Sequence, residues 1–495
     1  MEKTNKKLIQ NFIFKLSLEV LRIIIPIISI PYVYRLFKPE IMGNIEFSQS
    51  ISGYFFIFAG FGVYTYGLRE ISRIRDNKDK RNKIFSELFI ISTLSSFIVF
   101  IVYIGYIYFK FNSDILLRNM LLLNSIQILA YIFYIEWINE VFENYKFIAQ
   151  KTIVVKIINV ICIFIFIKIS DDFYKYLLLI NIFILFNNLI SFVYIKKYIK
   201  ITLKNLELKK YLFSLGTILL ISNINILYTQ LDKIMLGFYS NNIIEVVYYG
   251  IAQKVMSLIM ILIMSIISVT IPRLSYYLGQ ENKEKYESLF NRLFPYIYLL
   301  LFPMSIGIVI LSREIVYFFG GDKYLGGQIV VITFGIRMIV VTIESILSNQ
   351  VIFLHKKEKV MAIIIGICGI FNFLMKYFLI KTNNLNSSNA IFTTMTAEIL
   401  IIILDYWYIK KYLELNLEIF KVKNLKYLLI SLIFFLIKYL FRNLKINIVV
   451  YSLILIIACL IIYFTLLILL KDKCILEILS NIRNRFNLKK LRSKK

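Results

Sequence analysis

The stretch INIVVYSLILIIACLIIYFTLLILL, residues 446–470, contains no charged side chain. An α-helix rises about 1.5 Å per residue, so this stretch is long enough to cross the hydrocarbon core of a bilayer, which is about 30 Å thick. A helix also satisfies its own backbone hydrogen bonds, as any segment inside lipid must. Residues 446–470 are therefore predicted to form a transmembrane helix.

Similar apolar runs recur along the whole chain, separated by short joints rich in lysine. Of the 495 residues, 59% are hydrophobic and 16% aromatic, and the mean hydropathy of +0.74 is too high for a soluble protein of this size. We therefore expect an all-α, polytopic membrane protein with about 14 transmembrane helices. Hydropathy places them at residues 11–35, 42–66, 84–108, 116–137, 148–169, 174–195, 211–236, 247–272, 291–311, 326–353, 360–380, 388–409, 426–441 and 446–470.

The net charge of +28 follows the membrane topology. When the N-terminus is placed inside, alternate joints carry most of the Lys and Arg, among them residues 69–83, 196–210 and the tail 471–495. Cytoplasmic loops are enriched in these residues, so both termini are predicted to be cytoplasmic. The basic tail is expected to lie against anionic lipid head groups, and a nucleic-acid partner is not needed to explain the charge.

Residues that usually carry metal, redox or nucleotide chemistry are scarce. His355 is the only histidine, and the sequence has no Gly-Lys-Ser/Thr phosphate-binding loop. The cysteines lie far apart and have no metal-site spacing: Cys162, Cys368, Cys459 and Cys474. We expect no cofactor, no metal and no enzymatic activity. Glu19, Arg22 and two prolines interrupt the first apolar run, which indicates a retained span rather than a signal peptide.

A weak internal repeat relates the two halves of the chain. An offset of about 204 residues aligns Gln49 with Gln253 and Arg69 with Arg273, and it superposes the first three spans on spans seven to nine. Six spans followed by six more in the same orientation indicate two parallel bundles that can rock about a central cavity. The predicted domains are residues 1–210 and 211–415 for the bundles, 416–470 for two added helices, and 471–495 for a cytoplasmic tail.

Several spans contain charged residues, which are costly in hydrocarbon and usually face a cavity or a pathway. The basic candidates for a functional site are Arg22, Lys254 and Arg337. Carboxylates in a partly dry cavity bind protons or cations more readily than in water. The acidic candidates, for ion coupling or for structural pairing, are Asp232, Glu46, Glu344 and Glu398.

Structural explanations compete with function for most of these charges. Lys15, Glu19 and Arg22 follow helical spacing and can neutralise one another along one helix face. Arg337 and Glu344 are seven residues apart, so an internal pair is an alternative there.

Charges closer to span ends have a weaker claim to a functional site. Lys156 and Lys376 are best explained by side chains that extend toward the membrane surface, whereas Lys254, which can also partly extend toward the outer face, stays a leading candidate. Glu87 and Asp405 are expected to be solvated or paired with lysines of the loops.

Three collinear motifs resemble one protein family. The first runs from Ile30 through Pro31, Tyr34, Arg35, Pro39 and Glu40 to Gly43, Phe47, Gln49, Gly60 and Tyr66-Gly67-Leu68-Arg69-Glu70-Ile71. The second is Trp137 with Glu140, Phe142, Tyr145 and Ala149, and the third joins residues 228–237 to residues 248–254. Together they resemble the bacterial lipid-linked oligosaccharide (O-antigen repeat-unit) flippases, over residues 8–420.

The resemblance implies a fold, a substrate and partners. That family belongs to a superfamily that also holds multidrug extruders and lipid II flippases, and its fold is two six-helix bundles. It implies alternating-access transport of a polyprenyl-diphosphate-linked oligosaccharide across the bacterial cytoplasmic membrane for surface polysaccharide synthesis. The diphosphate would contact Arg22, Lys254 and Arg337. The expected partners are the lipid-linked substrate, membrane lipids and other polysaccharide-assembly proteins.

Two alternatives remain at this point. A cation-coupled drug extruder of the same superfamily usually has twelve spans and an acidic pocket, whereas this chain is predicted to have fourteen spans and central basic residues. A membrane glycan polymerase or ligase needs a catalytic surface outside the membrane, and the predicted outer loops are short.

Overall fold

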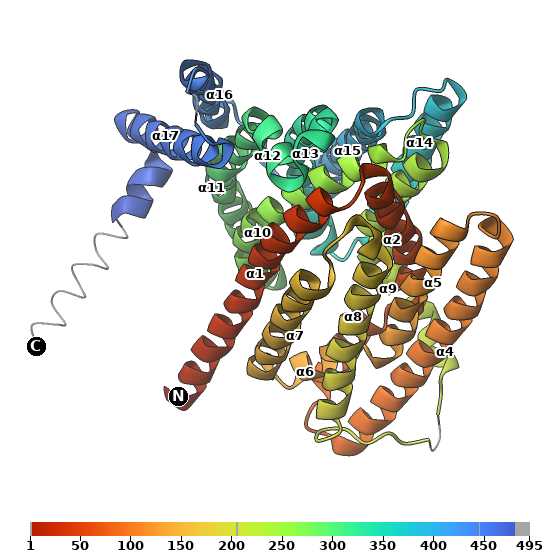
Figure 1. Cartoon of the computed structure of the whole chain (residues 1–495). Coiled ribbons are helices and arrows are strands. Elements are labelled where there is room, and N and C mark those ends of the chain that lie inside the picture. The colour runs from red at the N-terminus through yellow and green to blue at the C-terminus, as the bar shows by residue number, and fades with distance from the viewer. Residues whose placement is uncertain (1, 204–205, 445, 481–495) are drawn as a thin grey trace, which may run out of the picture. The chain divides into compact units, whose positions relative to one another are not determined.

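The computed structural model describes the backbone of residues 2–203, 206–444 and 446–480 (Figure 1). Within these ranges the side chains are described except those of residues 2–13, 15, 16, 19, 22, 220–228 and 268–269. The described chain consists of helices and their connections, with no strand assigned in it. The predicted all-α fold class is therefore confirmed.

The longer helices of the first part of the chain are α1 (Glu2–Leu36), α2 (Pro39–Gly60), α3 (Val63–Arg73), α4 (Lys78–Lys110), α5 (Ile115–Ala130), α6 (Glu136–Val141), α7 (Tyr145–Phe166), α8 (Phe173–Ile195) and α9 (Lys209–Tyr239). Those of the second part are α10 (Ile244–Gly279), α11 (Lys283–Ile310), α12 (Ser312–Gly320), α13 (Gln328–Ile346), α14 (Glu358–Lys381), α15 (Ser387–Tyr408), α16 (Leu425–Phe441) and α17 (Ile448–Leu469). The short 3-10 helices are η1 (Tyr131–Phe133), η2 (Ser170–Asp172), η3 (Asp322–Gly327) and η6 (Val422–Asn424). The π-helical segments η4 (Leu347–Phe353) and η5 (Ile409–Leu413) continue α13 and α15.

Twelve segments of the described chain are long and apolar enough to cross a membrane. They include α17, on which the stretch 446–470 falls, and the segment Val422–Phe441 that contains the shortest predicted span. The two other predicted spans, 11–35 and 211–236, fall on α1 and α9, where part of the side chains lies outside the described residues. The chain is a multi-pass membrane protein of about 14 transmembrane helices.

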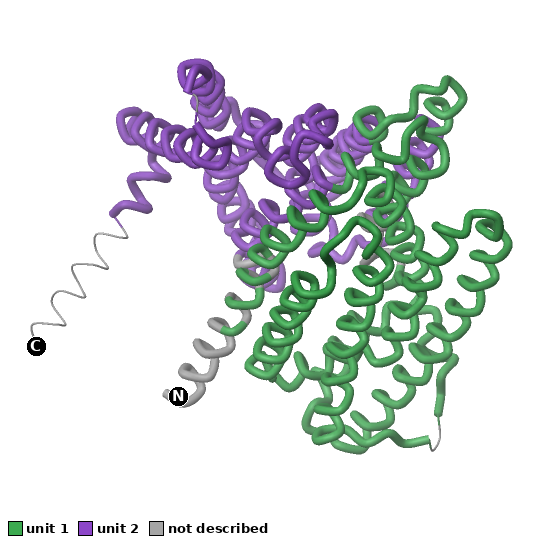
Figure 2. Tube along the Cα trace, in the orientation of Figure 1, with its two compact units in different colours: residues 1–250, 376–390 green, residues 251–375, 391–495 purple. Residues whose placement is uncertain are grey.

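The chain divides into two compact units (Figure 2). Unit 1 contains residues 1–250 and 376–390, and unit 2 contains residues 251–375 and 391–495. Helix α9 belongs to unit 1 because it packs along α2. The predicted boundary at residue 210 comes from the internal sequence repeat, whereas the two units are defined by contacts between residues. The predicted division therefore stays a prediction.

Helix α2 is the centre of unit 1 and packs against α4, α5 and α9. Pro39 begins the helix at a position where the missing backbone N–H costs nothing. The contact with α9 is close because Gly237 has no side chain: a Cβ there would lie 2.1 Å from the ring of Phe47. The buried Phe47 ring therefore sets the separation of these two helices.

In unit 2, helix α11 packs against α13 and α16 and carries a row of buried aromatic rings. Its buried rings recur every four residues, which places them on one side of the helix, and each contacts the next: Tyr286, Phe290, Phe294, Tyr298 and Phe302. The two phenols donate hydrogen bonds to carbonyl oxygens of Gln350 and Ile419, at 2.8 and 3.0 Å. The buried rings thus form an apolar row, and the hydroxyls of its two tyrosines are satisfied by backbone carbonyls.

Candidate functional site

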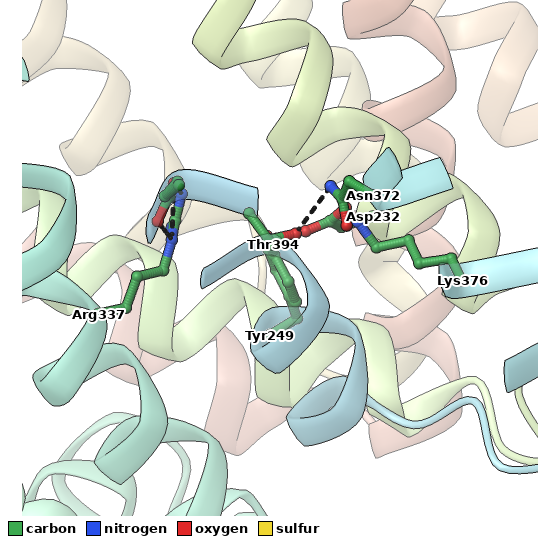
Figure 3. A network of polar contacts seen from close by, with 7 residues as sticks. Asp232, Tyr249, Arg337, Asn372, Lys376 and Thr394 are labelled. Carbon is green, nitrogen blue, oxygen red and sulfur yellow. Dashed lines mark hydrogen bonds and ion pairs between the residues drawn. The ribbon is translucent and has the colours of Figure 1, made fainter. Parts of the chain in front are cut away.

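Asp232 of α9 is buried and paired with neighbouring side chains within unit 1 (Figure 3). Its carboxylate is completely buried and accepts a hydrogen bond of 2.7 Å from the hydroxyl of Tyr249 on α10. The ammonium of Lys376 on α14, which is also completely buried, forms an ion pair with the other carboxylate oxygen. The structural pairing considered for Asp232 is therefore present in the structure, and ion coupling by this residue stays a prediction.

This geometry corrects the prediction for Lys376. We expected its ammonium to extend toward the membrane surface, but its side chain is 0% exposed. Lys376 and Asp232 are far apart in the sequence, so the periodicity of a single helix could not reveal the pair. An isolated charge in this interior is unfavourable, and the carboxylate supplies the compensation that water supplies elsewhere.

The neighbouring residue, Lys233, pairs with Glu46 on α2. Glu46 is buried and accepts a hydrogen bond of 2.7 Å from the hydroxyl of Tyr34, while the Lys233 ammonium lies 3.5 Å from its second oxygen. Gly250 leaves room for the carboxylate, because a Cβ there would lie 2.9 Å from it. The structure thus pairs Glu46 as well.

These contacts explain what the family-like motifs do. Tyr34 of the first motif and Lys233 of the third both contact Glu46. Phe47 of the first motif packs against Gly237 of the third, where α2 meets α9. The second motif joins them at Trp137, whose buried indole fills the space over Gly67. Within unit 1, the three motifs therefore specify helix packing and the pairing of buried charges.

A further buried ion pair in unit 1 was missed by the sequence interpretation. Lys151 of α7 pairs with Glu136 of α6 and donates a 2.7 Å hydrogen bond to the hydroxyl of Ser191 on α8. The three residues join three helices. Their only sequence signal is a charge near the end of an apolar run, which does not distinguish a buried pair from a solvated one.

Arg337 of α13 is engaged by Glu398 of α15 within unit 2 (Figure 3). The guanidinium Nε lies 3.0 and 3.1 Å from the two carboxylate oxygens, and Nη2 also contacts the carboxylate. Both side chains are at least nine-tenths buried. Such forked contacts are among the stronger charge-assisted hydrogen bonds, so this guanidinium already has an anionic partner.

Glu344 and Asp405 share one hydroxyl in unit 2. Ser348 lies 3.1 Å from Glu344 and 2.7 Å from Asp405, measured from its Oγ to the carboxylate oxygens. All three residues are buried. The Ser348 hydroxyl has one proton, so it can donate to only one of these two carboxylates at a time. Glu344 therefore keeps its place as a predicted ion-coupling residue.

Two acidic residues expected to be solvated or paired with loop lysines are buried instead. Asp405 is 0% exposed and contacts Ser348. Glu87 is also 0% exposed, and it accepts hydrogen bonds from the Tyr211 hydroxyl at 2.5 Å and from the backbone N–H of Glu207 at 2.8 Å. Their positions near the ends of the predicted spans suggested contact with water, but in the structure other parts of the protein cover both carboxylates.

Of the two remaining basic candidates, Lys254 and Arg22, the structure describes the side chain of Lys254 only. Lys254 is half-buried on α10, in the part of that helix that belongs to unit 2. Arg22 lies on α1, but its side chain is outside the described residues, as are those of Lys15 and Glu19. Their contact with a substrate therefore stays a prediction.

The paired networks have a definite chemical character. Asp232, Glu46 and Glu398 each face a cation at hydrogen-bond or ion-pair distance, so their charges are compensated inside their own units. Among the described residues, no group of three or more His, Cys, Asp or Glu side chains is arranged to hold a metal ion. These ion pairs join neighbouring helices of the same unit.

Comparison with known proteins identifies relatives of this chain. A family model described as "Polysaccharide biosynthesis protein" matches residues 8–278. A putative O-antigen transporter of Shigella dysenteriae is 23% identical over 346 residues, which cover 68% of this chain and 84% of that protein.

Solved membrane transporters share the fold. The lipid II flippase MurJ in an inward closed conformation has a TM-score of 0.71 and 17% identity, covering 93% of this chain and 99% of its own. An inward-facing multidrug resistance transporter of the MATE family, in the MOP superfamily, has a TM-score of 0.61 and 14% identity, covering 80% and 98%. At such identities the likeness establishes the architecture alone.

Proposed function

The chain belongs to the family of polysaccharide biosynthesis proteins, and we propose that it is a flippase for polyprenyl-diphosphate-linked oligosaccharides. The observation that carries the proposal is the family match over residues 8–278. The likeness to a protein named as a putative O-antigen transporter supports it. The flippase would move its substrate from the inner to the outer leaflet by alternating access, for surface polysaccharide synthesis.

The chemistry of the substrate explains why basic residues would be needed. A diphosphate bears negative charge, and its passage through a membrane interior costs the hydration that it loses. Guanidinium and ammonium groups can replace that hydration with charge-assisted hydrogen bonds. We propose Arg22 and Lys254 as the first contacts of the diphosphate. Arg337 is the weaker candidate, because Glu398 already engages its guanidinium.

The proposal includes a location and partners. The chain would lie in the bacterial cytoplasmic membrane with both termini in the cytoplasm, as the distribution of Lys and Arg favours. Its partners would be the lipid-linked substrate, the surrounding lipids and other proteins of polysaccharide assembly. The relatives named above are transporters, which supports transport rather than catalysis.

The test is a translocation assay in vesicles. Purified protein is reconstituted with a fluorescent polyprenyl-diphosphate-linked oligosaccharide, and the fraction of label that an external quencher reaches is followed over time. We expect wild type to equilibrate the label between leaflets. Folded Arg22→Ala and Lys254→Ala variants should slow this equilibration at least about tenfold, as loss of a charged contact predicts. Empty vesicles are the control.

Two outcomes would contradict the proposal. Equal rates in protein-containing and empty vesicles would refute flippase activity toward this substrate. Transport of cationic drugs, with none of the lipid-linked sugar, would favour the multidrug extruder whose fold the chain shares. Unchanged rates in both folded variants would refute the proposed diphosphate contacts without refuting the function.

A further inference from the structure

A cavity of about 430 Å³ lies inside unit 1, between α7 and α8. Ile25 of α1 and Phe56 of α2 complete its apolar lining. Its polar lining residues are Tyr134, Thr152, Lys156, Asn159, Asn187 and Asn188. We call this space the α7–α8 cavity. Its volume is in the range of small-molecule sites, which combine an apolar wall with a few polar groups.

Three polar atoms of this lining have no hydrogen-bond partner among the described residues. They are the hydroxyl of Thr152, the side-chain amide nitrogen of Asn159 and the side-chain carbonyl oxygen of Asn187. Each atom is buried, although each residue as a whole is half-buried. Buried polar atoms are usually satisfied, and leaving one unpaired costs about 1–3 kcal/mol.

The polar residues form a stripe at helical spacing. Thr152, Lys156 and Asn159 are four and three residues apart on α7, so they lie on one face of that helix. Asn187 and Asn188 face the same cavity from α8. The side-chain amide of Asn188 is engaged, because it donates a 3.0 Å hydrogen bond to the carbonyl of Ala130. On α7 and α8, all the buried side-chain atoms without a partner among the described residues thus belong to residues that line this cavity.

The lining indicates which kind of ligand the cavity suits. An acyl chain would leave all three polar atoms unsatisfied. A cationic drug would need an acidic wall, and none of the described lining residues is acidic, whereas Lys156 adds a positive charge. A hydroxyl-rich ligand can donate to the Asn187 oxygen, accept from the Asn159 nitrogen and do either with Thr152.

From this match we infer that the α7–α8 cavity is a glycan subsite, which binds sugar hydroxyls of the transported lipid through Thr152, Asn159 and Asn187. The inference rests on the proposed function for the identity of the ligand. It separates two tasks within the protein: the basic residues hold the diphosphate, and the α7–α8 cavity holds part of the sugar.

The experiment compares two lipids that differ only in the sugar. Equilibrium binding to the reconstituted full chain is measured for a polyprenyl diphosphate carrying a trisaccharide and for the same lipid without sugar. The variants are Thr152→Val, which keeps the shape of the side chain, and the triple variant Thr152→Val/Asn159→Leu/Asn187→Leu. Thr217→Val is the matched control, because this exposed hydroxyl donates to the carbonyl of Phe213 on its own helix.

We expect the triple variant to lower affinity for the glycosylated lipid at least about tenfold and Thr152→Val about two- to fivefold. Affinity for the sugarless lipid should change less than about twofold. An equal loss for both lipids, or no loss for either, overturns the inference, and the second result is what a cavity that holds only water predicts. If wild type shows the sugar-dependent difference but moves neither lipid, the glycan subsite stands and the flippase function falls.

Discussion

The Asp232 network and the α7–α8 cavity both place polar groups inside unit 1, but they treat them in opposite ways. Around Asp232, the carboxylate has an ammonium and a phenol as partners. In the α7–α8 cavity, three polar atoms have no partner among the described residues. Polar groups that already have partners within the protein stabilise the fold and are not available to a ligand. Buried polar groups without partners lower the stability of the ligand-free protein, and a ligand that hydrogen-bonds to them recovers that free energy.

The largest expected effect comes from removing one member of the Asp232 network. Lys376→Met should lower the free energy of unfolding by about 3–5 kcal/mol, because it leaves a buried carboxylate without its counter-ion. Thermal or denaturant unfolding in detergent measures this. The double variant Asp232→Asn/Lys376→Met removes both charges and should recover most of the loss. Lys381→Met, at an exposed position on the same helix, is the control.

A double variant no more stable than Lys376→Met would contradict this account. It would mean that the lysine stabilises unit 1 through its packing and not through its charge.

Tyr249→Phe should have the next largest effect, about 1.5–3 kcal/mol, since it removes a hydrogen bond to a charged acceptor. The same unfolding experiment applies. Tyr248→Phe changes a half-buried tyrosine one residue away and should change stability much less. Equal losses of stability in the two variants would show that the hydrogen bond from the Tyr249 hydroxyl does not contribute to the stability of unit 1.

Gly237→Ala tests the packing that brings α9 to α2, and with it Lys233 to Glu46. The new Cβ would lie 2.1 Å from the Phe47 ring, so a loss of about 1–3 kcal/mol is expected. Gly216→Ala on the same helix meets nothing within 4 Å and should be neutral or stabilising by up to about 1 kcal/mol. Adding Phe47→Leu to Gly237→Ala should restore part of the loss. Without that recovery, the close contact would not be the cause.

The smallest expected effect has the opposite sign and belongs to the cavity. Thr152→Val replaces an unpartnered hydroxyl with a methyl group of similar size, so stability should be unchanged or raised by up to about 1 kcal/mol. Unfolding of the ligand-free protein checks it. A clear loss of stability would show that the hydroxyl has a partner, and the contrast between the two regions would then disappear.

The sequence by itself determined the membrane class and the positions of the spans. Hydropathy is a local property, so an uncharged run such as residues 446–470 reports a spanning helix whatever surrounds it. The family-like motifs were also readable, because short runs such as Tyr248 to Lys254 keep their order along the chain. Charged residues within spans could be found in the same way, since each interrupts its own apolar run.

Only the tertiary structure decided what those charges do. Lys376 was expected to reach the membrane surface, and Arg337 had Glu344 as its sequence neighbour, yet their partners are Asp232 and Glu398. The unpaired atoms of Thr152, Asn159 and Asn187 were likewise invisible, because a missing partner is a property of the surroundings. Hydropathy reports how each helix meets the membrane, whereas pairing depends on which helices pack together, and that is set by contacts between residues far apart in the chain.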